Sequence, residues 1–423
     1  MPRRESRRSC SAQQRRRCGP GNRVSGEFPI VLSNGPQPGS KAWNGRNGLA
    51  EVAAAGVTHV RTGRADWSLA AVDAQLAEQR VLLDAAGAHG LRAWLWLGDA
   101  ANLPSSSPQP SDQARLLARI ADGVQGHPAL GAYKGIDEPR NPFRGANWIR
   151  PAGMIRAYTR LKQLDPVHPV VVTQAPIATV AQLTPYRPAF DVTGADAYPV
   201  SYPPGTHTKT GNRDISVVGD VTRKMVSAAG AKPVWMTLQI AWSGVAPSHD
   251  KPNVVPRFPT LQAERFMAYQ AIVAGARGLV FFGGHLTQVA SPEDAKLGWN
   301  WTFWEQVLRP LVEELTASRP ALTAPNAKPQ VKSPTAGIDL VTRDDGMFLY
   351  VIAVRRSGTT SLATFNGLPK GVQAGEVMHE YVQRPLPPPI GAGSQVYRPV
   401  EVDGGGFRDW LAPHDARVYR FRR

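Results

Sequence analysis

Beyond its eighteenth residue this 423-residue sequence contains no cysteine, because both of its cysteines, Cys10 and Cys18, lie near the start. The rest of the chain therefore has no disulfide and no cysteine-ligated metal site. Long hydrophobic runs are missing as well, since no stretch approaches the roughly twenty apolar residues that a membrane-spanning helix needs. We therefore expect neither a transmembrane helix nor a membrane partner.

Acidic residues are scarce relative to basic ones: 33 Asp and Glu stand against 49 Lys and Arg, which gives a net charge of +16. Such a surplus can indicate a nucleic-acid or other polyanionic partner. However, eight arginines and one glutamate lie in the first 23 residues, a segment without hydrophobic periodicity or interleaved aromatic residues. We predict that residues 1–26 form a disordered basic tail, and we do not expect a nucleic-acid partner. The tail has no apolar export segment, so localisation stays open, as does the oligomeric state.

Several catalytic motifs are also missing. No G-x-S-x-G elbow, P-loop or dinucleotide fingerprint occurs with the right flanks. Metal-dependent barrel hydrolases use ligands such as His-x-His at the end of the first strand, whereas that strand here ends in LSNG. We therefore expect no metal and no cofactor.

What the sequence does contain is a repeated unit of short apolar strand, loop, Ala/Leu-rich amphipathic helix and tight turn. About eight such units in about 300 residues are typical of a (β/α)₈ TIM barrel, which we assign to residues 27–320. The fifth unit, residues 177–188, is short for a full helix. The predicted strands are 29–32, 58–62, 92–97, 130–136, 170–173, 192–196, 234–238 and 278–282, and the main helices are 69–88, 112–124, 149–164, 215–229 and 261–274.

From Ile338 the sequence alternates with period two and carries turn signals such as RDDG and FNG. This change predicts a small all-β sandwich domain over residues 321–423, packed on the barrel, and we find no chemistry in it. Its predicted strands are 338–342, 348–354, 361–365, 396–402 and 417–421.

The two rims of the predicted barrel differ. The turns that lead into strands are short, whereas the segments that leave strands are long and irregular, as in the active-site loops of such barrels. These long segments carry many aromatic rings, which can stack on sugars or can pin the loops to the barrel. The rings are those of Trp43, Phe143, Trp148, Tyr198, Tyr202, Trp242, Phe258, Trp299 and Trp301.

The fourth strand, in GAYKGIDEP, ends in two adjacent carboxylates, Asp137 and Glu138. Paired acids at a strand end repel each other and are costly to desolvate, so one is expected to have a raised pKa, as a general acid needs. The competing interpretation is that Asp137 caps the next helix, which accounts for one acid only. Other strand ends offer further candidates for the same cleft: Arg61, Asp99, Asp196, Tyr198, Gln239, Trp242 and His285.

Asp196 is the best partner for Glu138, because cleavage of a glycosidic bond needs one acid to protonate the leaving oxygen and another to attack or to activate water. We expect their carboxyls to lie about 5 to 9 Å apart. Asp196 can instead be a structural acid that pairs with Arg61, and Arg61 can hold Asp137 ionised. Glu264 is predicted just inside a helix start, where an acid commonly stabilises the helix dipole.

The chain from Phe28 to Ser318 resembles the clan-A type of (β/α)₈ glycoside hydrolases: Asp137-Glu138-Pro139 looks like that family's Asn-Glu-Pro, and DWLAPHDARVYRF resembles the end of the β-sandwich that follows such barrels. The resemblance implies that Glu138 is the acid/base. The sequence departs from the family at Gln239, near the place of the nucleophilic Glu of retaining members. We therefore expect a glycoside hydrolase with a carbohydrate substrate; the alternative is a barrel that binds carbohydrate without cleaving it.

Overall fold

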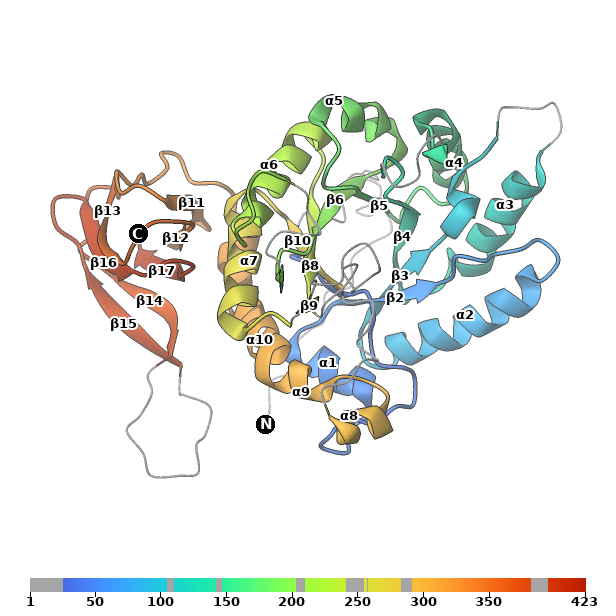
Figure 1. Cartoon of the computed structure of the whole chain (residues 1–423), viewed down its shortest axis with the longest axis horizontal. Helices are drawn as coiled ribbons and strands as arrows, with labels where there is room; N and C mark the ends of the chain where they lie inside the picture. The colour runs from blue at the N-terminus through green and yellow to red at the C-terminus, as the bar shows by residue number, and fades with distance from the viewer. Residues whose placement is uncertain are drawn as a thin grey trace, which may run out of the picture.

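The structure, a computed structural model, describes residues 26–104, 110–141, 147–202, 210–240, 255–256, 258–282, 291–381 and 395–423. These form a closed barrel of eight parallel strands ringed by helices, and antiparallel sheets at the C-terminal end (Figure 1). The predicted tail lies outside the described residues except for Gly26. Within the described residues, no helix is both long enough and apolar enough to cross a membrane.

The predicted barrel is confirmed, with each strand within one residue of its predicted bounds. The strand order around the barrel is β1-β10-β8-β6-β5-β4-β3-β2. The eight strands are β1 (Ile30–Leu32), β2 (His59–Gly63), β3 (Arg92–Trp96), β4 (Leu130–Asp137), β5 (Val170–Gln174), β6 (Val192–Ala197), β8 (Trp235–Gln239) and β10 (Gly278–Phe282).

The helices surround this barrel because their apolar sides face the strands. In α3, for example, Ser111 caps the first turn by accepting a hydrogen bond from the Ala114 amide, and Leu117 and Ile120 are buried. The fifth unit is short, as predicted. The helices are α1 (Gly48–Ala55), α2 (Val72–Gly87), α3 (Asp112–Val124), α4 (Pro151–Leu164), α5 (Val180–Leu183), α6 (Val217–Ala229), α7 (Leu261–Val273), α8 (Pro292–Leu297), α9 (Trp301–Phe303), α10 (Arg309–Ala317) and α11 (Arg319–Thr323), with shorter helical turns at Gly98–Ala101, Thr184–Ala189 and Trp304–Leu308.

The C-terminal strands form two packed sheets, as predicted. A five-stranded sheet has the order β11-β12-β17-β14-β15, and β13 pairs with β16. The prediction missed β14 and β16: β14 is interrupted by a bulge near His379, and β16 follows three glycines that read as a loop. The strands are β11 (Ile338–Asp344), β12 (Phe348–Arg355), β13 (Ser361–Asn366), β14 (Ala374–Tyr381), β15 (Gln395–Glu401), β16 (Gly406–Leu411) and β17 (Ala416–Arg422).

The five-stranded sheet is buried on both faces. Along β12, Tyr350 and Ile352 join the hydrophobic core of the barrel, whereas Leu349 and Val351 join the core under β13 and β16. Successive side chains of a strand point to opposite faces, so this alternation gives three layers: the barrel helices, the five-stranded sheet and the β13–β16 sheet.

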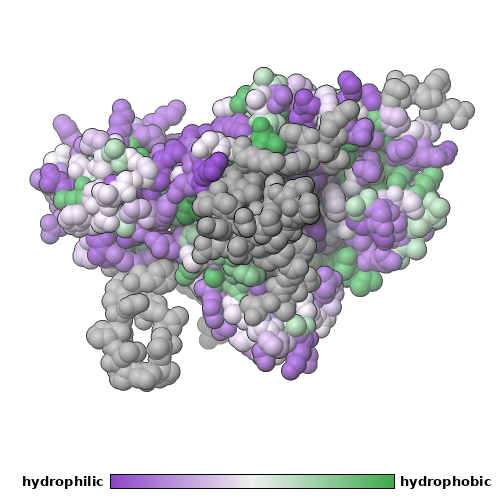
Figure 2. Space-filling view, in the orientation of Figure 1, coloured by the Kyte–Doolittle hydropathy of each residue, from purple (hydrophilic) through white to green (hydrophobic). Residues whose placement is uncertain are grey.

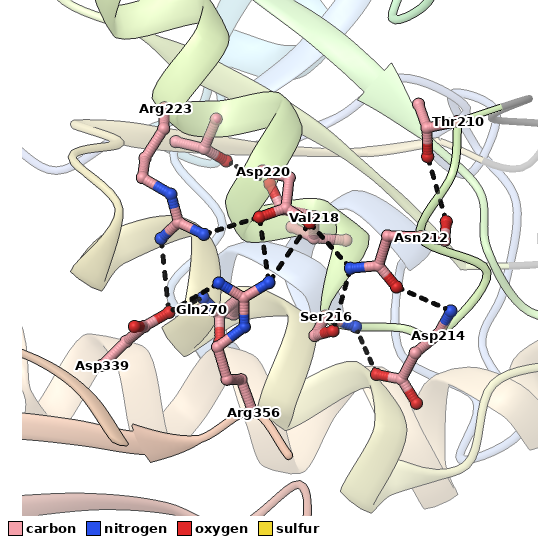
Figure 3. A network of polar contacts seen from close by, with 11 residues as sticks. Thr210, Asn212, Asp214, Ser216, Val218, Asp220, Arg223, Gln270, Asp339 and Arg356 are labelled. Atoms are coloured by element: carbon pink, nitrogen blue, oxygen red, sulfur yellow. Dashed lines mark hydrogen bonds and ion pairs between the residues drawn. The ribbon is translucent and has the colours of Figure 1, made fainter. Parts of the chain in front are cut away.

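Polar contacts also join the sandwich to α6 and α7 (Figure 3). The Arg223 guanidinium bonds Asp220 at 2.7 Å and Asp339 at 3.2 Å, and Arg356 donates to Asp220 at 3.0 Å. Gln270 donates to Asp339 at 2.8 Å. Because charges of opposite sign alternate across the boundary, the sandwich is fixed against the two barrel helices.

Candidate active site

Strand β4 ends in an irregular turn that carries both predicted acids. A β-bulge lies between Lys134 and Asp137 in the pairing with β5, and Glu138 has a left-handed backbone with φ of 44°. The Glu138 amide donates to the Thr173 carbonyl at 2.8 Å, which holds this turn. A non-glycine residue in this conformation costs about 1–3 kcal/mol, and such strain is concentrated at functional sites.

The cation that pairs with Asp137 is Lys134. Its ammonium lies 2.5 Å from Asp137 Oδ1 and 4.8 Å from the centre of the Trp96 ring. The Lys134 side chain is 4% exposed, so burial lowers its pKa while Asp137 opposes this shift. Sequence reasoning gave the pairing with Asp137 to Arg61 and missed Lys134, although a single lysine within an apolar strand was a visible signal.

Glu138 and Asp196 lie in hydrogen-bonding contact, which is closer than the separation we expected. Asp196, at the end of β6, is 8% exposed; burial raises its pKa well above the usual range, and the charge of Glu138 and the hydrogen bond with it act in the same direction. Asn141, which the sequence analysis also missed, donates to Glu138 Oε2 at 2.6 Å. The two acids therefore behave as a pair that keeps a proton.

Tyr198 and Arg61 complete a six-residue cluster. The Tyr198 ring stacks on Phe282 with centroids 5.7 Å apart, and burial, followed by the charge of Asp196, raises the pKa of Tyr198. Burial lowers the pKa of the partly buried Arg61, and the charge of Asp137 opposes this effect. The structure thus brings together, at one end of β2, β4 and β6, Arg61, Lys134, Asp137, Glu138, Asp196 and Tyr198.

Gln239 does not line the cleft, because its side chain is buried and bonded to the backbone. It is 1% exposed at the end of β8; its Nε2 donates to the Val200 carbonyl at 2.8 Å, and its Oε1 accepts from the Val200 amide at 2.9 Å. A glutamate can accept from the amide but cannot donate to the carbonyl when ionised. Gln239 therefore clamps the segment that follows Tyr198.

The remaining predicted residues are not brought to the cluster by the described part of the chain. Asp99 is exposed in the Gly98–Ala101 turn, and no described contact joins it to the six residues. Trp242 and His285 lie outside the described residues.

Two of the predicted loop rings are buried, and one of them, Trp299, also lines a cavity near Arg61. Trp299 and Trp301 are 4% and 1% exposed, with ring centroids 4.5 Å apart, and Trp299 Nε1 donates to the Asn34 carbonyl at 3.0 Å. These rings pin their loop, as the alternative interpretation predicted. Phe143 and the side chain of Tyr202 lie outside the described residues.

A polar cavity of about 320 Å³ lies beside the cluster. It is lined by Arg61, Thr62 and the segment that follows β1. Within the described part of the chain, Asn34 Oδ1 and Thr62 Oγ1 are buried and have no hydrogen-bond partner. Buried polar atoms of this kind can accept or donate to ligand hydroxyls. A larger cavity, of about 600 Å³, opens at the opposite end of the barrel near His59 and Trp235, away from Glu138 and Asp196.

The donor set does not suit a metal ion: among the described residues, no group of three or more His, Cys, Asp or Glu side chains is arranged to hold one. The chemistry of the cluster therefore rests on its carboxyls, its phenol and its two cations.

Glu264 is a buried acid outside this cluster. It lies in the first turn of α7, as predicted, is fully buried, and neither carboxyl oxygen has a hydrogen-bond partner among the described residues. Burial raises its pKa well above its ordinary value of 4.5. A carboxyl that keeps its proton carries no charge, so the predicted stabilisation of the helix dipole does not apply to it.

Replacing Glu264 by Gln is expected to flatten the pH dependence of stability. The unfolded chain releases this proton above about pH 4.5 and the native chain keeps it, so the free energy of unfolding falls as pH rises, by about 1.4 kcal/mol per pH unit. Gln cannot titrate, so the variant is more stable than wild type at neutral pH. Urea unfolding between pH 4 and 8 measures this, with the exposed helix-start variant Glu293→Gln as a control that follows wild type. Parallel curves for Glu264→Gln and wild type would contradict the expectation.

Solved glycoside hydrolases share this fold. The chain is similar to a family 51 α-L-arabinofuranosidase from Bifidobacterium longum, with 12% identity, a TM-score of 0.52, and 94% of this chain and 96% of that chain covered. It is also similar to an α-amylase from Anoxybacillus, with 11% identity, a TM-score of 0.52 and coverage of 95% and 99%. A third similar structure is a family 30 subfamily 8 xylanase from Clostridium acetobutylicum, with 10% identity, a TM-score of 0.50 and coverage of 94% and 96%.

No family model and no curated protein sequence matches the chain. The predicted resemblance to a glycoside hydrolase barrel followed by a β-sandwich is thus confirmed in the fold. A barrel of this kind supports many reactions, so its function depends on the residues of the six-residue cluster.

Proposed function

We propose that the chain is a glycoside hydrolase that cleaves O-glycosidic bonds of an oligo- or polysaccharide with two carboxyl groups, those of Glu138 and Asp196. One observation carries the proposal: two acids from non-adjacent strands meet at the end of the barrel, and the buried one has a strongly raised pKa. A carboxyl that stays protonated at neutral pH beside a carboxylate can supply the proton that a departing sugar oxygen needs.

Glu138 acts as the general acid because it is the partly exposed member of the pair, whereas Asp196 is buried. The pair holds one proton, which burial favours on Asp196, so when substrate separates the carboxyls this proton has to pass across their hydrogen bond to Glu138 and leave Asp196 as a carboxylate. Glu138 then protonates the leaving oxygen, and Asp196 attacks the anomeric carbon or acts as the base for a water. Both roles require the sugar to lie between the two carboxyl groups. The separation of the carboxyl groups is then about 5 Å for direct attack by Asp196 and about 6.5–9.5 Å when a water lies between Asp196 and the sugar. Binding of substrate therefore moves Glu138 away from Asp196.

Arg61, Tyr198 and the cavity beside them form the proposed surface for sugar hydroxyls. Arg61 lines this cavity together with Thr62 and the segment after β1, and its guanidinium is the proposed donor to a sugar hydroxyl. Asp137, paired with Lys134, lies next to the site of the developing cation and is proposed to stabilise it electrostatically. Asp99, Trp242 and His285 remain proposed substrate contacts, whereas Gln239 acts indirectly, by holding the segment that follows Tyr198.

A second function, carbohydrate binding without cleavage, is favoured by one observation. Gln239 stands near the place of a nucleophilic Glu in retaining relatives, and its carboxamide bonds the Val200 backbone. A barrel that has lost its nucleophile can keep the sugar-binding wall and lose turnover.

A panel of soluble polysaccharides and aryl glycosides distinguishes the two functions. We expect the purified chain to release reducing ends from at least one polysaccharide, and the anomer of the first product, read by NMR, then assigns Asp196 as nucleophile or as base. Binding in an affinity gel without any release of reducing ends would instead support the carbohydrate-binding barrel.

A further inference from the structure

The outer face of the β13–β16 sheet carries an exposed aromatic platform. The inward side chains of these strands, among them Phe365 and Phe407, are buried in the core between the two sheets. The side chains on the opposite face alternate with them and point to solvent. This outer face is made of Leu362, Thr364, Asn366, Arg408 and Trp410.

Trp410 and Leu362 are unusually exposed for their type. They lie directly opposite each other in the register of the two strands and are 62% and 41% exposed. Trp410 is the one aromatic residue among the large hydrophobic side chains that the described part of the chain leaves exposed. A tryptophan ring in contact with water on a flat sheet loses hydrophobic stabilisation, so a binding role offers a physical reason for it.

The platform rests on a rigid support. Asp409, between Arg408 and Trp410, is buried; its carboxylate accepts two hydrogen bonds from Arg398, at 2.7 and 2.9 Å, and one from the Tyr419 hydroxyl at 3.0 Å. The same carboxylate accepts from the Trp410 amide at 2.9 Å. The strand is thereby fixed, so a ligand on Trp410 does not have to order it.

The other side chains of this face suit hydroxyl groups. Arg408 lies opposite Thr364, two residues from Trp410, and makes no ion pair with any described residue. The five outer residues of the two strands include no acid. An apolar ring bordered by a guanidinium, a hydroxyl and an amide matches a sugar, which has an apolar C–H face and a rim of hydroxyls.

We propose that this face binds a polysaccharide chain, with one sugar ring stacked on Trp410 and its hydroxyls bonded by Arg408 and Thr364. Figure 1 shows β13 and β16 on the side of the sandwich away from the barrel, so the site is separate from the acid cluster. The choice of a saccharide as ligand rests on the proposed function. The surrounding surface of the sandwich is mainly hydrophilic (Figure 2).

The small size of the apolar surface argues against a protein partner or a second copy of the chain. A stable protein interface buries about 1,600 Å² in total, with an apolar centre. Here two exposed apolar side chains are bordered by polar ones. A single sugar ring needs no larger surface.

Affinity electrophoresis of the full chain in gels that contain xylan, mixed-linkage β-glucan or soluble starch tests the proposal. We expect at least one polysaccharide to retard wild type and Trp410→Tyr, and the apparent affinity of Trp410→Ala to fall by about 10-fold, since the variant loses the ring on which the sugar stacks. Because Trp410 is exposed, thermal unfolding of Trp410→Ala should match wild type, which separates loss of binding from loss of folding.

Three outcomes would overturn the proposal: no retardation of wild type, equal retardation of wild type and Trp410→Ala, or retardation that disappears in about 1 M salt, which indicates adsorption of a polyanion by Arg408. A concentration-dependent dimer that Trp410→Ala abolishes would assign the face to a second copy instead. The Glu305→Gln variant, at an exposed glutamate outside both sites and run in the same gels, should bind as wild type does. If the gels show retardation that depends on Trp410 but the chain has no hydrolytic activity, the proposed function of the barrel is wrong and the proposed site at Trp410 is still supported.

Discussion

Glu138→Gln is expected to lower kcat/KM for the polysaccharide substrate by about 10²–10⁴-fold, the usual contribution of a general acid. The amide has nearly the same shape and its oxygen can still accept from Asn141, so the fold at the end of β4 is kept. What the variant loses is the transferable proton. Reducing-end release from the best polysaccharide of the panel measures the effect.

The leaving group provides the internal test of this assignment. An aryl glycoside with an acidic phenol needs little protonation, so the loss in Glu138→Gln should be much smaller on that substrate than on the polysaccharide. Glu305→Gln, at an exposed glutamate, should match wild type on both. Equal losses on both substrates would show that Glu138 is not the acid, and full activity would end the hydrolase assignment.

Asp196→Asn is expected to abolish activity and to raise stability at neutral pH. The loss of kcat/KM should reach at least about 100-fold, because the variant lacks the carboxylate that faces the anomeric carbon. Stability changes in the opposite direction. The native pKa of Asp196 lies well above its ordinary value of 3.8, so the unfolded chain binds fewer protons than the native chain above that pH, and the free energy of unfolding of wild type falls as pH rises.

Asparagine has no titrating proton, so the variant lacks this decline. Its advantage in unfolding free energy should grow by about 1.4 kcal/mol per pH unit above about pH 3.8, until the native carboxyl of wild type ionises. Denaturant unfolding at several pH values measures this difference. Asp344→Asn, at an acid of the sandwich that pairs with Arg423, should not reproduce it. A variant that is inactive but less stable than wild type at every pH would mean that Asp196 is a structural acid.

The sequence predicted the barrel because each strand is a short apolar run with a long loop after it. It also pointed to Glu138 and Asp196, since acids at the ends of buried strands are conspicuous. The contacts of Lys134 and Asn141 could not be predicted, because they depend on a bulge and a left-handed residue that leave no periodic signal. Gln239 bonds a backbone 39 residues away, and such pairing follows only from the closed barrel.

The five-stranded sheet belongs to two hydrophobic cores at once, one shared with the barrel helices and one shared with β13 and β16. The C-terminal region is therefore not a detachable module: cutting the chain before it would leave apolar surface of α7 in water. The two regions are expected to melt in one transition, and the barrel cannot be transplanted alone without redesign of that helix.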